Sequence, residues 1–429
     1  LDRRDLDFPL VGPPNEPVSL VAHAMGAAAA SLVRDGGTLQ LGIGAVADAI
    51  TWSLLLRQRE PGPFQRLAST VLGGEHSAAG AFAIGGDRPF GEGLYAETEM
   101  FVPGYLELYR GGILKRSVPA PEHGEEVEAV LRAGFFLGPR TFYEALLGLD
   151  AEARQRFRMM PISFTNAMGS DPAAAASRRR HARFLNSSLF ASILGDVASE
   201  TLDDGRVVGG VGGQFDFASM AHGLPEARSV LLVKSTHGSG DDTRSNIRPT
   251  AGHATVPRHL RDLMVTEYGI ADLRGKTDRE VIEAMIAIAD ARFVDELVSA
   301  AQRSKKLPGS YNVPDRVRGR NHPQRLREDL APLREAGYLP ELPFGSELSP
   351  VEIKLKRALT AFARASWAEK VKHLAKNAGA IRRPPDAASP YLERLGLKDT
   401  TSARERAMQA MVVAALGAAG AIHVGARPG

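Results

Sequence analysis

Two glutamates, Glu97 and Glu99, stand one residue apart in a stretch that continues with the apolar residues Met100 and Phe101. On a β-strand, residues separated by one position face the same side of the sheet, so both carboxylates would share a face. A carboxylate beside apolar side chains is partly desolvated and can act as a nucleophile. The alternative interpretation is an exposed acidic edge strand without a chemical role.

A glycine-rich stretch, residues 209–217, is a second candidate. It holds Gly209, Gly210, Gly212 and Gly213, followed by Gln214. Because glycine has no Cβ, backbone N–H groups in such a stretch can approach a ligand closely. The alternative interpretation is a bulged β-hairpin that binds nothing.

A third candidate is the turn Gly42-Ile43-Gly44, which lies between a predicted strand over 38–41 and a predicted helix over 47–56. A Gly-x-Gly-x-x-Ala turn in this position can bind the pyrophosphate of a dinucleotide. NAD binding also needs an acidic residue at the end of the next strand, and Glu60 and Glu75 do not fit that place. A tight turn without a ligand is the alternative.

The sequence argues against several other kinds of catalytic site. With zero Cys, it has no thiol nucleophile, disulfide or thiolate zinc site. It contains neither a His-Glu-x-x-His nor a Gly-x-Ser-x-Gly motif, so we predict no metal site and no serine hydrolase. Lys276 follows a glycine as in a phosphate-binding loop, but the preceding glycine has the wrong spacing. The basic run Arg178-Arg179-Arg180-His181 is typical of a solvated helix face.

The elements that would position these residues indicate an α/β fold. We predict helices over 18–34 and 281–301, strands over 68–72, 159–164, 207–209, 230–234 and 263–266, and a connector over 301–347. Thr277, Ser349 and Ser402 each precede a Glu by three positions. This is the spacing of a capping box, so we expect a helix to begin after each of them.

Composition limits the partners. The 53 Lys and Arg residues exceed the 50 Asp and Glu residues by only three, which disfavours a nucleic-acid binder. No apolar run approaches the roughly 18 residues that a membrane span needs. We therefore expect no nucleic-acid or membrane partner, and the absence of Cys makes the cytoplasm the default location.

Taken together in chain order, four blocks of sequence resemble the acetyl-CoA hydrolase/transferase family. The blocks are Leu39-Gln40-Leu41-Gly42-Ile43-Gly44, Thr98-Glu99-Met100-Phe101 with Gly104 and Gly111, Gly210-Val211-Gly212-Gly213-Gln214-Phe215-Asp216-Phe217, and the run from Val265 to Thr277. The family comprises class I coenzyme A transferases, including 4-hydroxybutyrate and succinyl-CoA:acetate CoA-transferases. The resemblance covers residues 38–277 and implies a CoA-transferase-like open α/β domain.

The resemblance implies an acyl-CoA hydrolase or CoA-transferase, with acetyl-CoA as the expected substrate. In the family, the glutamate that matches Glu99 attacks the acyl-CoA thioester. An acyl-glutamyl anhydride forms first and a glutamyl-CoA thioester follows, and a second carboxylic acid reverses the steps. By the same resemblance, the oxyanion is stabilised by backbone N–H groups of Ile43 and of Gly212 or Gly213.

The resemblance also implies substrate contacts around these groups. Gly42, Gly44 and Gln214 lie in the matched blocks, and Lys234 and Arg248 lie beside them as candidates for the phosphates of coenzyme A. Arg244 and Lys276 are further candidates for the same role. Coenzyme A would be a substrate, and no bound cofactor is expected.

The sequence departs from the family pattern in two places. Family members carry a first α/β half before the Leu39 block, whereas only 38 residues precede Leu39 here, and Val102-Pro103 replaces the usual Ser-Asp. We therefore expect a lead segment over 1–37 that is the remnant of a missing N-terminal half, a catalytic domain over 38–345 and a helical appendage over 346–429. The expected partners are an acyl-CoA, a small carboxylic acid, and either a second copy of the chain or the missing half.

Two alternatives remain open at this point. One is an NAD-dependent oxidoreductase that uses the turn from Gly42 to Gly44. The other is a non-catalytic relative that binds acyl-CoA and does not turn it over.

Overall fold

The computed structural model describes residues 10, 12, 14–122, 124–169, 171–202 and 204–422. Part of the predicted lead segment therefore lies outside the described residues. The chain divides into two compact units, Leu1–Gly345 and Ser346–Gly429. Within the described residues, no helix is long and apolar enough to cross a membrane.

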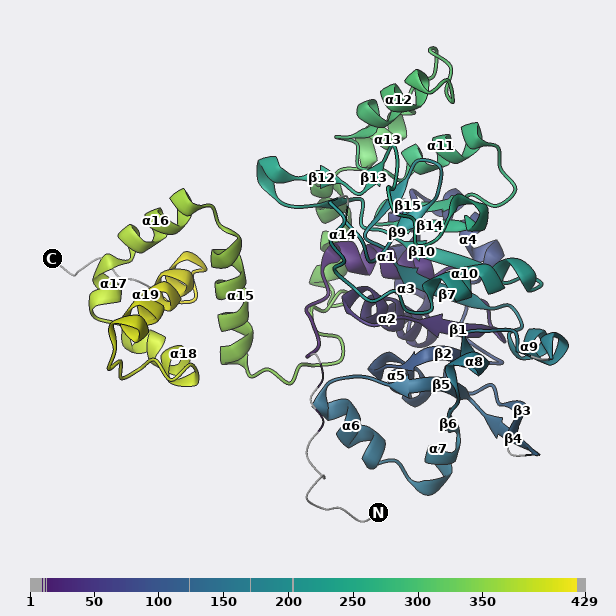
Figure 1. Cartoon of the computed structure of the whole chain (residues 1–429), viewed down its shortest axis with the longest axis horizontal. Coiled ribbons are helices and arrows are strands. Elements are labelled where there is room, and N and C mark those ends of the chain that lie inside the picture. Colours follow the sequence, from purple (N-terminus) through teal and green to yellow (C-terminus); the bar gives the residue numbers. More distant parts are fainter. Residues whose placement is uncertain are drawn as a thin grey trace. The chain divides into compact units, whose positions relative to one another are not determined.

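The first unit is built on an eight-stranded sheet with the strand order β15-β14-β10-β7-β1-β2-β5-β6 (Figure 1). All neighbouring strands are parallel except β14 and β15, which are antiparallel. The strands span β1 (Thr38–Leu41), β2 (Tyr95–Phe101), β5 (Leu131–Phe136), β6 (Phe157–Met159), β7 (Arg183–Ser187), β10 (Arg228–Leu232), β14 (Leu263–Thr266) and β15 (Gly269–Asp272). Parallel strands separated by helices define the α/β class that the sequence predicts, and this prediction is confirmed.

Fourteen α-helices connect or cover these strands in the described part of the first unit. They are α1 (Leu20–Ala30), α2 (Ala45–Arg59), α3 (Pro61–Leu72), α4 (Glu75–Ile84), α5 (Pro103–Arg110), α6 (Arg140–Leu147), α7 (Ala151–Gln155), α8 (Ile162–Thr165), α9 (Pro172–Arg178), α10 (Gln214–Gly223), α11 (Asp278–Ala287), α12 (Val294–Arg303), α13 (Asp315–Arg320) and α14 (Pro323–Glu335).

Shorter strands form three small sheets beside the main one. They are β3 (Val118–Glu122) with β4 (Glu125–Ala129), β8 (Phe190–Ser192) with β9 (Val197–Ala198) and β13 (Ile247–Arg248), and β11 (Thr236–His237) with β12 (Arg244–Ser245).

The two faces of the main sheet differ in character. Leu39 pairs with Ala96, and both belong to the apolar core that the helices α1, α2 and α3 complete. Because side chains alternate along a strand, Gln40, Glu97 and Glu99 point to the opposite face. On that face α10 packs against β7 and β10, so polar residues of the central strands meet α10 and the segments around it.

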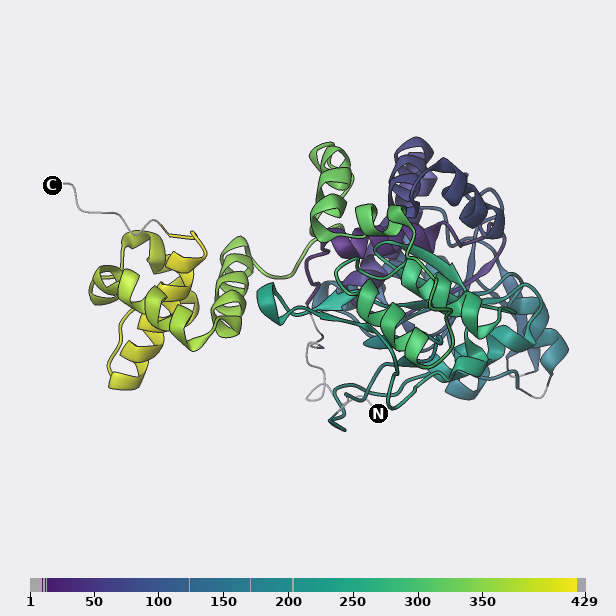
Figure 2. The ribbon, with the colours of Figure 1, turned by 90° about the horizontal axis from the view of Figure 1, so that it is seen from above.

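The second unit is helical. It contains α15 (Pro350–Arg364), α16 (Trp367–Lys376), α17 (Ala378–Arg382), α18 (Ser389–Arg394) and α19 (Ala403–Ala418). Helices α15, α16 and α17 contact α19 (Figure 2). An apolar core of its own, which includes Leu355, Tyr391 and Leu416, holds this unit together.

The predicted helix starts are confirmed, and several predicted strands are wrong. Capping boxes form at Thr277, Ser349 and Ser402. Residues 68–72 belong to α3, because the buried positions of this segment recur every three or four residues and define one face of a helix. Over 159–164 the strand β6 ends at Met159 and α8 follows.

Three further predictions need correction. Residues 207–209 form only an isolated bridge between Val207 and Thr201. The helix predicted over 281–301 is divided into α11 and α12. The predicted connector over 301–347 contains α13 and α14, and α14 buries Leu326, Leu330 and Leu333 at helical spacing.

Candidate active site

A cavity of about 270 Å³ lies at the carboxyl ends of the central parallel strands. In an open α/β sheet, ligands bind outside the carboxyl ends of the strands, so this is the expected place for a site. The cavity brings together residues from all three predicted stretches. The predicted residues that line the cavity are Gly42, Ile43, Glu99, Gly210, Gly212, Gly213 and Gln214.

The carboxylate of Glu99 is held in a defined orientation. Its Oε2 accepts a hydrogen bond of 2.9 Å from Nδ2 of Asn166, and its Oε1 lies on the side of Gly212. One carboxylate oxygen is thus engaged by an amide donor. The other oxygen faces the glycine-rich turn, where a substrate could reach it.

Asn166 itself is fixed by its surroundings at the end of α8. Its Oδ1 accepts a hydrogen bond of 2.9 Å from the hydroxyl of Thr165. The guanidinium of Arg179 donates to three backbone carbonyls around it, at 2.9 Å to Phe164, 3.1 Å to Thr165 and 3.0 Å to Ala167. The sequence analysis missed Asn166, because no motif marks a lone Asn in a short helix.

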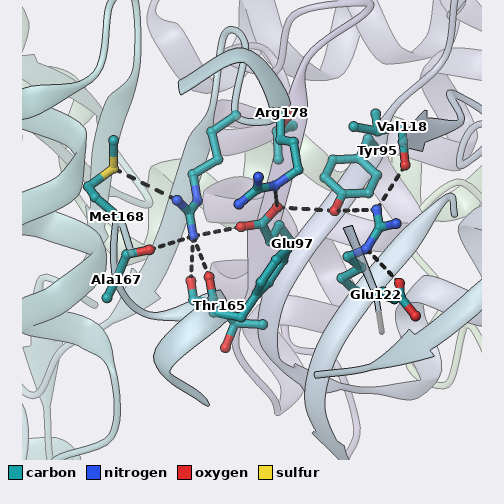
Figure 3. A network of polar contacts seen from close by, with 12 residues as sticks. Tyr95, Glu97, Val118, Glu122, Thr165, Ala167, Met168 and Arg178 are labelled. Atoms are coloured by element: carbon teal, nitrogen blue, oxygen red, sulfur yellow. Dashed lines mark hydrogen bonds and ion pairs between the residues drawn. The ribbon is translucent and has the colours of Figure 1, made fainter. Parts of the chain in front are cut away.

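Glu97 does not reach the cavity. It is fully buried, and its carboxylate forms ion pairs with Arg179 at 2.6 Å and with Arg178 at 3.2 Å (Figure 3). The hydroxyl of Tyr95 donates to it at 3.1 Å and also accepts from Arg132 at 3.3 Å. Both the exposed acidic edge considered for Glu97 and the solvated helix face predicted for the basic run are therefore wrong at these residues.

The glycines at the site meet specific steric demands. Gly44, the N-cap of α2, has a φ of 104°, which favours glycine. A Cβ on Gly213 would lie 2.2 Å from Nδ2 of Asn166 and 2.4 Å from Oε2 of Glu99. Only glycine therefore fits at position 213 while Asn166 holds Glu99.

The stretch after these glycines forms a helix and not a hairpin. Gln214 begins α10, and its side-chain amide donates to the hydroxyl of Ser188 at 2.9 Å. Two positions further on, burial raises the pKa of the Asp216 carboxyl, and the nearby Glu99 carboxylate adds to this effect, while a hydrogen bond with Asn166 opposes it. Two carboxyl groups thus share the surroundings of Asn166.

The remaining predicted residues lie outside the lining of this cavity. Lys234 is exposed just after β10. The guanidinium of Arg248 stacks over the ring of Phe190, 3.9 Å from its centroid. Their assignment to the phosphates of coenzyme A stays a prediction. Across the part of the chain that the structure describes, no three His, Asp or Glu side chains converge so as to hold a metal ion.

Residues 138–301 match the family described as acetyl-CoA hydrolase/transferase C-terminal domain. Over these residues the chain is similar to the acetyl-CoA hydrolase/transferase family. The matched range includes Asn166 and the glycines at 212 and 213, whereas Ile43 and Glu99 precede it. The matched range therefore covers the glycine-rich turn and Asn166, whose side chain binds Glu99.

Curated proteins that this chain resembles carry names from coenzyme A chemistry. It is 26% identical over 280 residues to the 4-hydroxybutyrate coenzyme A transferase of Clostridium kluyveri, a match that covers 65% of this chain and 54% of that protein. It is 28% identical over 148 residues to the acetyl-CoA hydrolase of Eremothecium gossypii, covering 32% and 27% of the two chains. The chain spans about half the length of the transferase it matches.

The fold of this chain also has a counterpart among solved structures. RipA from Yersinia pestis superposes with a TM-score of 0.53 at 23% identity, over 70% of this chain and 57% of that one. This likeness confirms the open α/β fold that the sequence predicts.

Proposed function

We propose that this chain provides the reactive carboxylate of an acyl-CoA hydrolase or CoA-transferase, and that Glu99 is the nucleophile. The observation that carries the proposal is the Glu99 carboxylate in the cavity, with Oε2 bound by Asn166 at 2.9 Å and Oε1 on the side of Gly212. A carboxylate nucleophile needs no separate general base, which fits a cavity without a Ser-His or Cys-His pair among its lining residues.

The proposed reaction proceeds through two acyl transfers. An oxygen of Glu99 attacks the thioester carbonyl, the C–S bond breaks, and an acyl-glutamyl anhydride and a CoA thiolate result. The thiolate then attacks Cδ of Glu99 and releases the acyl group as a carboxylate, which leaves a glutamyl-CoA thioester. A second carboxylate reverses these steps in a transferase, and water cleaves an intermediate in a hydrolase.

Backbone and side-chain donors can stabilise both oxyanions of this sequence. Within the described residues, the N–H groups of Ile43, Gly212 and Gly213 donate no backbone hydrogen bond, so they are available to the oxygen of the thioester carbonyl. When thiolate attacks Cδ of Glu99, negative charge develops on a Glu99 oxygen, and the amide of Asn166 already points at Oε2. One preorganised donor of this kind is worth roughly 10²–10³ in rate.

The names of the relatives favour coenzyme A over a dinucleotide as the ligand of this cavity. We propose acetyl-CoA as the acyl donor and a small carboxylic acid as the acceptor. Coenzyme A would act as a substrate without a bound cofactor.

We also propose that a further polypeptide covers the mouth of the cavity. Ile43, Val211 and Phe215 stand around the site with 42%, 59% and 44% of their surface exposed. An anhydride and a thioester must be shielded from water if transfer to an acid is to prevail. A second copy of the chain or another protein segment would supply both the cover and the shield.

An isotope experiment separates the two reaction classes. With acetyl-CoA and labelled acetate, a transferase incorporates label into acetyl-CoA faster than free coenzyme A accumulates. The reverse order identifies a hydrolase. Incorporation without any dependence on Glu99, tested with Glu99→Gln, would reject the proposed nucleophile.

A further inference from the structure

A second cavity, of about 330 Å³, lies at the start of α11 in the first unit. Its lining includes four cationic side chains, Arg258, Arg261, Arg274 and Lys276, and a single carboxylate, Asp278. It opens to solvent beside the last turn of α10, where His222 contributes to the lining.

This basic cavity lies at the opposite end of the sheet from the candidate active site. Leu232, the last residue of β10, lines the active-site cavity, whereas Arg228, the first residue of β10, bonds to Asp262 beside Arg274. A five-residue strand spans about 13 Å. Helix α10 runs between the same two places, from Gln214 in the active-site cavity to His222 in the basic cavity.

Its cations outnumber the carboxylates that neutralise them. Asp278 is shared by three cations, at 3.4 Å from Arg258, 3.4 Å from Arg261 and 2.6 Å from Lys306. Within the described residues, the ammonium of Lys276 makes no ion pair. The carboxylate of Glu280 accepts hydrogen bonds from Thr277 and interacts with Lys276 through its charge, and Lys276 contributes to lowering its pKa. This side of the cavity thus keeps an excess of positive charge.

The other side of the cavity is balanced in charge at its buried edge. Arg274 and Arg228 both bind Asp262, at 2.5 and 2.7 Å, and Arg228 also pairs with Asp272 at 2.6 Å. Counting both sides and including Glu280, six cations face four carboxylates, and the excess lies on the side of Asp278. An arrangement of like charges costs free energy unless an anion compensates it.

Two of the guanidinium groups are held in place by the backbone. Arg261 donates to the carbonyl of Leu194 at 3.1 Å and to that of Lys276 at 2.9 Å. Arg274 donates to the carbonyl of Ala221 at 3.3 Å as well as to Asp262. Because these groups are ordered before any ligand arrives, less entropy is lost on binding.

We propose that this basic cavity binds a phosphate-bearing small molecule through a diphosphate group. Guanidinium groups match phosphate oxygens in geometry, and a compact lysine ammonium complements them as a point charge. The excess of positive charge along the cavity suits the negative charge of a diphosphate ester near neutral pH. The site is independent of the proposed reaction at Glu99, since its residues lie at the other end of the strands.

Calorimetric titration of the full chain with inorganic diphosphate, ADP and coenzyme A tests the proposal. The test variant is Arg258→Gln with Lys276→Gln, and the matched control is Arg279→Gln, an exposed residue on α11 that pairs with Glu283 at 2.8 Å outside the cavity. We expect diphosphate and ADP to bind the unaltered chain, at least ten-fold more weakly to the double variant and within two-fold to the control. Equal affinity for diphosphate and ADP identifies the diphosphate group as sufficient, and tighter binding of ADP identifies a nucleotide ligand.

Three results would overturn the proposal. One is the absence of diphosphate or ADP binding at millimolar concentration, and another is unchanged binding by the double variant. The third is a parallel loss of acetyl-CoA turnover in the double variant at saturating acetyl-CoA, which would make the cavity part of the active site. If the double variant does not fold, Lys276→Gln alone provides the same comparison, because its ammonium makes no ion pair among the described residues.

Discussion

The amide Nδ2 of Asn166 lies 2.9 Å from Oε2 of Glu99, although the two residues stand 67 positions apart in the chain. The contact is supported from behind by Arg179, which bonds three carbonyls around Asn166 and also pairs with Glu97 at 2.6 Å. Arg179 thus links the buried carboxylate of Glu97 to the segment around Asn166, which orients Glu99. Figure 3 shows how Arg178, Glu97 and the carbonyls of Thr165 and Ala167 meet in this network.

Removing the amide of Asn166 should slow acyl transfer without unfolding the protein. We expect Asn166→Ala to lower kcat by about 10²–10³, the effect of losing one preorganised oxyanion donor. The measurement is steady-state turnover of acetyl-CoA together with a melting curve. Asn312→Ala is the matched control, because among the described residues the side chain of Asn312 bonds only the nearby carbonyl of Ser310, at an exposed place. Unchanged turnover in Asn166→Ala would remove Asn166 from the site.

Substitutions of the two neighbouring glutamates should have different effects. Replacing Glu99 should reduce activity, and replacing Glu97 should reduce stability. Glu99→Gln should abolish turnover and leave the free energy of unfolding nearly unchanged, because its carboxylate is not part of a buried ion pair. Glu97→Gln leaves two buried guanidinium groups with a neutral partner, so we expect it to destabilise the fold by up to about 3–5 kcal/mol. Denaturant unfolding and turnover at low temperature measure the two effects. Equal losses of turnover in two stably folded variants would contradict the separate roles.

A methyl group at position 213 should disrupt the site. In Gly213→Ala, the new Cβ would lie within 2.4 Å of both Asn166 Nδ2 and Glu99 Oε2, so these side chains must move apart. We expect turnover to fall at least a hundredfold, while Gly223→Ala at the other end of α10 has no heavy atom within 4 Å of its Cβ and should keep full activity. Full activity in Gly213→Ala would show that the contact between Asn166 and Glu99 is dispensable.

Asp48 on α2 should make stability depend on pH. Burial raises its pKa from 3.8 to about 6. The folded state therefore binds this proton more tightly than the unfolded state, and stability falls as pH rises from about 4 through 6. We expect Asp48→Asn to stabilise the protein at pH 8 by up to about 3 kcal/mol and to have little effect at pH 4. The free energy of unfolding at both pH values measures this, and a gain that is equal at both would contradict the raised pKa.

The sequence predicted those elements whose local signals agree with their packing. Thr277 and Ser349 start helices because a Glu three positions later completes each capping box, which is a purely local interaction. The strand at 38–41 and the strand at 263–266 were also predicted at their observed bounds. Short apolar segments were ambiguous. Residues 68–72 were predicted as a strand, and tertiary packing places them in a helix with one buried face.

The site was harder to predict, because its contacts join distant segments. The three glycine and glutamate stretches were recognised by their order along the chain, and the structure places Ile43, Glu99, Gly212 and Gly213 around one cavity. Asn166 carried no local signal, since it acts only through its position opposite β2. For the same reason the basic run at Arg178 and Arg179 looked solvated, although Glu97 and the backbone carbonyls that bury it come from other elements.

Chemical trapping of the intermediate tests the role of Glu99 most directly. Borohydride reduces a glutamyl thioester to an alcohol and leaves a free carboxylate unchanged. In a preparation with measured turnover, treatment with acetyl-CoA and then borohydride should convert Glu99 to the alcohol, seen as a change in mass of the peptide that carries it, with no change in the peptide of the Glu99→Gln variant. An unaltered Glu99 peptide in an enzyme that turns over acetyl-CoA would contradict a glutamyl-CoA intermediate.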